Sequence, residues 1–177
     1  MKYDLAAMRI IHYPDPRLRR RAEPVTQFGD ELDALARRML ALMREHKGVG
    51  LAGPQVGVGQ RIFVACVSEN PDDARVFVNP ELHDLEGAAE AEEGCLSIPG
   101  VLAQVRRATH ARITALDALG RPFELHGADL MCRVWQHETD HLNGVLIVDR
   151  MNAGDRIASR ATLRALEQSH RERAGGD

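Results

Sequence analysis

The sequence has little of what marks a secreted, membrane or nucleic-acid-binding protein. Only three of its 177 residues are cysteines, an odd number that argues against a disulfide framework. The longest wholly apolar run, residues 62–67, is far shorter than the roughly 18 residues that suggest a membrane span. Aromatic residues make up only 4% of the chain, so platforms for stacking bases or sugars are scarce.

The charge balance is also modest. Twenty-three basic and 26 acidic residues give a formal net charge of −3, which does not favour broad binding to nucleic acid or membranes. We therefore expect no membrane association and no direct DNA binding. The N-terminus lacks an apolar segment followed by a small-residue cleavage site, which predicts a cytoplasmic protein. The length fits one domain over residues 1–177, large enough to bury a real core.

Apolar spacing near the N-terminus predicts an amphipathic helix followed by a loop. Between residues 30 and 46 apolar side chains recur three and four apart, as in a helix with one buried face. Asp30 can cap the start of this helix and Gly48 can end it. The segment GVGLAGPQVGVG, residues 48–59, has too many glycines for a helix and predicts a loop.

The middle of the chain predicts β-structure and its last third predicts helices. Short strands are expected at residues 61–67, 75–78, 101–105, 112–116, 122–125 and 145–148. Helical spacing returns at residue 128 and ends at Asn143-Gly144, and a polar helix is expected from 155 to about 173. The predicted class is α+β, with small antiparallel or mixed β-sheets around a central helix, and with an N-terminal and a C-terminal helix.

The central predicted helix carries the segment HETDH. His137 and His141 stand four residues apart, so they project from one helix face and can hold one metal ion. Glu138 lies beside the first histidine, where its carboxylate can take a proton from water without binding the metal. The alternative is a solvated helix face, but apolar Leu130 and Val134 on the same side favour burial.

A catalytic metal site with an open position usually has three protein ligands, so a third ligand must lie elsewhere. Cys95, in the turn EGCLSIPG, is the best candidate beyond Glu138. An intracellular cysteine is commonly a small buried apolar residue, and this interpretation suits Cys66 and Cys132. Residue types alone therefore leave the third ligand open.

Three separate segments resemble the peptide deformylase family in order and spacing. They are GVGLAGPQVG at 48–57, EGCLSIPG at 93–100 and QHETDHLNG at 136–144. The resemblance also includes the N-terminal arm, so residues 1–151 are the family part of the domain and 152–177 are a C-terminal helical tail. It implies a metal-dependent hydrolase that removes the N-formyl group from the N-terminal methionine of newly synthesised polypeptides and releases formate.

The resemblance also implies a metal and the residues around it. The metal is one divalent ion, Fe²⁺ in the first place, with Zn²⁺, Ni²⁺ and Co²⁺ as alternatives. Its ligands are expected to be Cys95, His137 and His141. Glu138 would act as base and then as acid, while the Gln55 side-chain amide and the Leu96 backbone N–H would stabilise the oxyanion.

An apolar slot for the methionine side chain is expected near the metal. Val49, Leu130 and Val134 are the candidates for its wall, with plain core packing as the alternative. Gly50 would let the substrate backbone approach closely. Carboxylates such as Asp140 are candidates for orienting the imidazoles.

The chain departs from the family pattern at two positions. Gly53 stands where the family most often has alanine, and we expect it to loosen the loop or make room. Leu102 stands where many members have an arginine or an aromatic residue, which leaves peptide contacts beyond the methionine open. Arg107 matches a family arginine, and either a solvated strand end or a pair with Glu93 would explain it.

The tail raises the question of a partner. Arg156, Arg160 and Arg164 recur every four residues and predict a basic stripe on one helix. In one bacterial class of the family the C-terminal helix docks near the ribosomal exit tunnel, so ribosome contact is one interpretation, and a solvated helix face is the other. Two rivals to deformylation remain: a neutral metallopeptidase, and an inactive paralogue that binds formylated termini or ribosomes.

Overall fold

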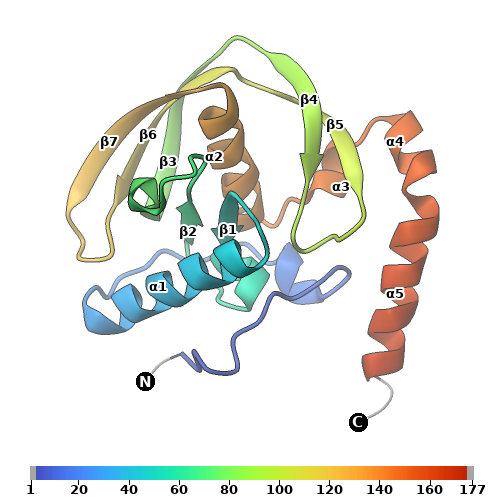
Figure 1. Ribbon diagram of the computed structural model, residues 1–177, viewed down its shortest axis with the longest axis horizontal. Coiled ribbons are helices and arrows are strands. Elements are labelled where there is room, and N and C mark those ends of the chain that lie inside the picture. The colour runs from blue at the N-terminus through green and yellow to red at the C-terminus, as the bar shows by residue number, and fades with distance from the viewer. Residues whose placement is uncertain (1–2, 175–177) are drawn as a thin grey trace.

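Two antiparallel β-structures enclose one helix in the computed structural model, which describes residues 3–174 (Figure 1). The larger sheet has the strand order β1-β2-β3-β6-β7. Its strands are β1 (Gly50–Ala52), β2 (Ile62–Ala65), β3 (Arg75–Glu86), β6 (His110–Leu116) and β7 (Pro122–Ala128). A separate two-stranded ribbon pairs β4 (Ala89–Gly94) with β5 (Leu102–Arg107). Helix α2 (Asp129–Leu142) lies between the sheet and the ribbon.

The remaining helices lie around this frame. Helix α1 (Asp30–Glu45) crosses in front of the sheet, and α5 (Arg160–Ala174) runs along the outer side of the ribbon (Figure 1). The shorter helices are η1 (Pro16–Arg19), η2 (Gly53–Val56), η3 (Pro71–Asp73), α3 (Ile147–Arg150) and α4 (Ala153–Ala158). The predicted α+β class and the central helix are confirmed. Among residues 3–174 no helix is both long enough and apolar enough to span a membrane.

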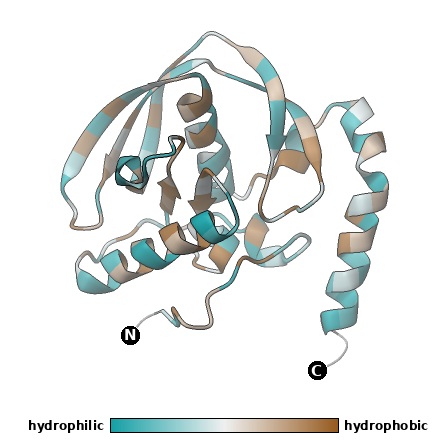
Figure 2. Ribbon diagram, viewed as in Figure 1, coloured by the Kyte–Doolittle hydropathy of each residue, from teal (hydrophilic) through white to brown (hydrophobic). Residues whose placement is uncertain are grey.

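Apolar periodicity explains why these elements pack as they do. The buried side chains of α1 lie on one face and include Leu35 and Met39, which pack with Leu51 of β1 and Ile62 of β2. Strand β6 buries every second residue, as a strand with one face on the core should. Figure 2 shows apolar colour concentrated on β1, β2 and part of α2.

Helix α2 is fixed to the large sheet by an aromatic contact. Trp135 is almost fully buried, and its ring centroid lies 6.0 Å from that of Phe77 on β3. Gly127 on β7 makes room for it, because a Cβ atom there would lie 2.5 Å from Trp135 Cζ3. This packing sets the position of the helix that carries the two histidines.

Several predicted elements were wrong. Residues 145–148 are not a strand, since helix α3 begins at Ile147 and buries it in an apolar cluster under the ribbon. The single polar helix predicted over 155–173 is two helices, because α4 ends at the C-cap Ser159 and α5 begins at Arg160. The predicted tail also extends to residues 175–177, which lie outside the described residues.

Other local differences concern glycine and charge. The glycine-rich segment is not only loop, since it forms β1 and then η2. Strand β4, whose sequence is AEAEEG, was not predicted because it lacks β-branched residues, and its pairing with β5 makes it a strand. Helix α1 begins at Asp30 itself, with Gly29 rather than Asp30 as the N-cap.

Candidate metal centre

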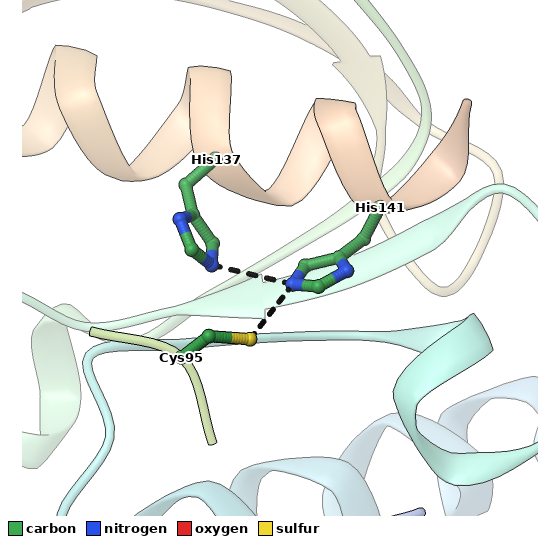
Figure 3. Close-up of side chains that lie close together, drawn as sticks. All are labelled: Cys95, His137 and His141. Atoms are coloured by element: carbon green, nitrogen blue, oxygen red, sulfur yellow. Dashed lines mark hydrogen bonds between the residues drawn. The ribbon is translucent and has the colours of Figure 1, made fainter. Parts of the chain in front are cut away.

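Three predicted ligands meet between α2 and the end of β4. His137 and His141 extend from α2, and Cys95 directly follows the last residue of β4 (Figure 3). The Sγ atom of Cys95 lies 3.3 Å from His141 Nε2, which lies 3.2 Å from His137 Nε2. All three donor atoms lie within 4.8 Å of one another. One sulfur and two imidazole nitrogens converging in this way fit one borderline-soft divalent ion.

Gln55, from the glycine-rich segment, lies next to the three predicted ligands. Its side chain is buried, and its Oε1 accepts a hydrogen bond of 2.7 Å from the backbone N–H of Ala52. This bond turns Nε2 the other way, where it donates to Ser97 Oγ at 3.3 Å and to Cys95 Sγ at 3.6 Å. The amide that the sequence predicts as an oxyanion donor therefore lies beside Cys95.

Glu138 lies in the wall of the same cavity, and its carboxylate is buried. Gly50 has no side chain and so leaves room for the Glu138 carboxylate, since a Cβ atom at residue 50 would lie 2.3 Å from Glu138 Oε1. Glu138 Oε2 has no hydrogen-bond partner within residues 3–174. Burial raises the pKa of Glu138 to about 7, so the group can hold or release a proton near neutrality.

The cavity beside these residues has a volume of about 570 Å³. The four predicted substrate-binding residues line it: Val49, Gly50, Leu130 and Val134. Leu96 lines it as well, next to Cys95, and its Cδ1 atom fills the space over Gly48. Their binding roles stay predictions, but the structure brings all of them to one apolar-walled hollow.

Comparison with known proteins agrees with this arrangement. A model of the family described as Polypeptide deformylase matches residues 7–156. The chain belongs to this family. A peptide deformylase of Alkalilimnicola ehrlichii is 46% identical over 175 residues, which are 97% of this chain and 97% of that protein.

Solved structures of peptide deformylases have the same fold. The chain matches a crystal structure from Legionella pneumophila with a TM-score of 0.86 at 40% identity, over 92% of this chain and 96% of that one. A Plasmodium falciparum peptide deformylase matches with a TM-score of 0.89 at 36% identity, over 93% and 98% of the two chains. As a peptide deformylase, the chain is a hydrolase that removes the N-formyl group of newly synthesised polypeptides.

One important residue of this deformylase was not predicted as a site residue. Glu93, on β4, faces His137 with 3.0 Å between Oε2 and the ring Nδ1. Burial opposes its charged form, but hydrogen bonds from His137 and Arg107 outweigh burial and lower the Glu93 pKa to about 2. The signal available in the sequence was its place in the second motif, two residues before Cys95.

Asp140 does not orient an imidazole, contrary to the expectation. Its Oδ2 accepts a 2.8 Å hydrogen bond from Arg107 Nη1, and its Oδ1 one of 2.6 Å from Arg150 Nη2. Arg107 also donates from Nε to Glu93 at 2.7 Å, so the predicted pair with Glu93 is confirmed. The carboxylate that holds His137 is therefore Glu93. Asp140 contacts Arg107, which in turn contacts Glu93.

The pKa values of the two histidines are shifted in opposite directions. For His137, burial favours the neutral ring, but hydrogen bonds to Cys95 and Glu93 outweigh it and raise the pKa to about 10. For His141, burial and the nearby charge of His137 lower the pKa well below its usual value. His141 therefore favours the neutral ring that a metal ligand needs, whereas His137 must give up a proton when it binds a metal ion.

Gly53 makes room within the deformylase loop. A Cβ atom there would lie 2.8 Å from the carbonyl oxygen of Gln60 and 2.9 Å from that of Val58. The glycine therefore makes room for a close approach of the backbone, which is one of the two expected effects. Leu102, the other departure, lies in the cavity wall with more than half of its surface exposed.

Proposed function

We propose that Cys95, His137 and His141 hold one divalent metal ion that serves deformylation of N-formylmethionyl peptides. The observation that carries this proposal is the convergence of their three donor atoms within 4.8 Å beside the cavity. When bound, the ion supplies a Lewis acid for the formyl oxygen and lowers the pKa of a coordinated water toward about 7.

Glu138 moves the proton in the proposed reaction. It takes a proton from the attacking water as oxygen adds to the formyl carbon, and it then gives that proton to the methionine amine. The C–N bond breaks, and formate leaves with the added oxygen. The buried carboxylate is suited to this task because it borders the cavity and its Oε2 has no partner in the described chain.

Two hydrogen-bond donors would stabilise the negative oxygen that develops on the formyl carbon. Gln55 offers Nε2, which its bond to Ala52 turns toward Cys95. Leu96 offers its backbone N–H directly after Cys95. Donors of this kind contribute about 2.7–4 kcal/mol each to the transition state.

The apolar part of the cavity suits the methionine side chain. Val49, Leu130 and Val134 would contact it, and Gly50 would let the substrate backbone come close. Burying a methionine side chain is worth about 1.5–3 kcal/mol. This contribution would favour methionine over small or charged first residues.

Formate release tests the function. Protein purified without oxygen should bind one metal ion and release formate from a formyl-Met tripeptide. Glu138→Gln carrying the same metal should be slower by about 10²–10⁴-fold. If both proteins hold one ion and neither releases formate, a binding-only paralogue explains the fold better. Cleavage of peptide bonds in unformylated peptides would instead favour a neutral metallopeptidase.

Among divalent ions we propose Fe²⁺ as the native one. A thiolate with two imidazoles also suits Zn²⁺, Ni²⁺ and Co²⁺, so bound metal must be measured directly. An iron form should lose activity in air as iron or Cys95 oxidises, and a zinc form should keep it longer. Undiminished aerobic activity of the iron-loaded protein would contradict this choice.

The substrate is a newly made chain, so we propose a cytoplasmic site of action and contact with the ribosome through the tail. Arg156 on α4 and Arg160 and Arg164 on α5 are all exposed, although the helix break at Ser159 interrupts the predicted stripe. Ribosome binding should weaken with salt and when the three arginines are replaced by glutamine. Unchanged affinity would leave a solvated helix face as the explanation.

A further inference from the structure

Arg133 is a nearly buried arginine in the cavity wall to which the reaction assigns no task. It lies on α2 one turn before His137, and 12% of its side-chain surface is exposed. Its Nη1 atom donates to Glu93 Oε1 at 2.7 Å and to the carbonyl oxygen of Val105 at 2.8 Å. Its Nη2 atom donates to the carbonyl oxygen of Ala89 at 2.9 Å. One side chain of the helix thus contacts both strands of the ribbon.

We propose that Arg133 is a positioning residue that holds the ribbon, and with it Cys95, at the correct distance from the histidines of α2. This inference rests on the proposed metal site. It assigns Arg133 no contact with substrate or metal. It predicts that metal affinity depends on a guanidinium that binds no metal.

The ribbon needs such a connection because it is not part of the large sheet. Within residues 3–174, strands β4 and β5 pair only with each other, and an isolated two-stranded ribbon is marginally stable. Cys95 directly follows β4, whereas its partner His141 is on α2. Any displacement of the ribbon from the helix therefore changes the 3.3 Å distance between Cys95 Sγ and His141 Nε2.

Arg133 also restrains the carboxylate that holds His137. Glu93 Oε1 accepts hydrogen bonds from Arg133 Nη1 and Arg107 Nε, while Oε2 accepts from Arg107 Nη2 and faces His137 Nδ1. Without Arg133, Oε2 would still face His137 of α2, but Oε1 would lose the donor that α2 supplies. A planar guanidinium can donate to several acceptors in fixed directions, and a lysine ammonium cannot reproduce that pattern.

The test compares Arg133→Met and Arg133→Lys with Arg106→Met, an exposed arginine on the same ribbon. Dissociation constants for Co²⁺ are measured by competition with a chelator, together with the thiolate-to-cobalt absorption band and the melting temperature. Arg133→Met should bind Co²⁺ about tenfold more weakly, the lower end of the range for residues behind a ligand. Its thiolate band should shift, Arg133→Lys should restore neither property, and Arg106→Met should behave as wild type.

Two results would overturn the inference. One is Co²⁺ binding by Arg133→Met within twofold of wild type with an unchanged thiolate band. The other is loss of folding in both Arg133 variants while Arg106→Met stays folded, which would make Arg133 a residue of the fold alone. Wild-type protein that binds Co²⁺ but releases no formate would contradict the proposed function and still leave the affinity comparison decisive. Wild type without a thiolate band would overturn both.

Discussion

At the scale of single residues, the site depends on side chains that are missing as well as on those that are present. Gly50 leaves the space that the Glu138 carboxylate fills, and the Gln55 amide is aimed by a bond to the backbone of Ala52. The Glu138 carboxylate and the Gln55 amide are therefore positioned by contacts within the protein. Small changes at either position should therefore alter catalysis more than stability.

Replacing Gly50 with alanine should displace Glu138. The new Cβ would lie 2.3 Å from Oε1, a distance that forces the carboxylate to move. We expect kcat/KM for a formyl-Met peptide to fall at least about tenfold, since misplaced catalytic groups commonly cost up to about 10². Gly59→Ala is the matched control because nothing lies within 4 Å of a Cβ there. Equal activity of the two variants would contradict the placement of Glu138.

Replacing Gln55 with leucine should lower kcat by about 10²–10³, the usual loss for one donor to a developing oxyanion. Ser97→Ala is the control, because it removes the other acceptor of the Gln55 amide and keeps the amide itself. Rates are measured on metal-loaded protein. A loss confined to KM would mean that Gln55 binds the ground state and has no special role in the transition state.

At the scale of elements, the site lies where helix α2 meets the β4–β5 ribbon, and charged side chains connect the two. Arg107 on β5 pairs with Glu93 on β4 and with Asp140 on α2. Its side chain is 4% exposed, so these contacts are shielded from water. Removing one member of such a buried group leaves uncompensated charge, unlike removing a member of a surface pair.

Arg107→Met should lower the free energy of unfolding by about 3–5 kcal/mol, because it leaves buried carboxylate charge with fewer partners. Arg121→Met is the comparison, since Arg121 pairs with Asp117 but is 74% exposed. That change should cost at most about 1 kcal/mol. Urea unfolding of both variants measures the difference. Similar losses would show that the buried network adds no more than a surface pair.

At the scale of the whole molecule, the proposed metal ligands join segments that lie far apart along the chain. Cys95 follows the ribbon, and the two histidines lie on a helix that packs against the large sheet. An ion that binds all three side chains therefore links the ribbon to the sheet through α2. Its binding free energy should add to the stability of the folded chain.

Removing the metal should lower the melting temperature. At a free-metal concentration about 1,000 times the dissociation constant, binding stabilises the folded state by about 4.1 kcal/mol. A chelator should remove this contribution from wild type and leave Cys95→Ala nearly unaffected, because that variant lacks the thiolate. Calorimetry with and without the chelator measures both shifts. An equal response of the two proteins would contradict Cys95 as a ligand.

Hydrophobic spacing and motif order were enough to predict α1, α2, the α+β class and the resemblance to the deformylase family. These features are local, because helical periodicity and short motifs are present in consecutive residues. Strand β4 could not be predicted in the same way, since its polar sequence becomes a strand only through β5. The helix at 147–150 and the break at Ser159 also depend on what each segment packs against.

The order of the residues along the chain already establishes which side chains are available: the HETDH helix, the cysteine turn and the glycine-rich segment. The partners of these side chains follow from how the elements pack. Glu93 rather than Asp140 faces His137, Arg133 joins α2 to the ribbon, and Gly53 leaves room for two backbone carbonyl oxygens. The physical reason is that hydrogen bonds, burial and close backbone approach act between residues distant in the chain, and their geometry exists only after the elements have packed.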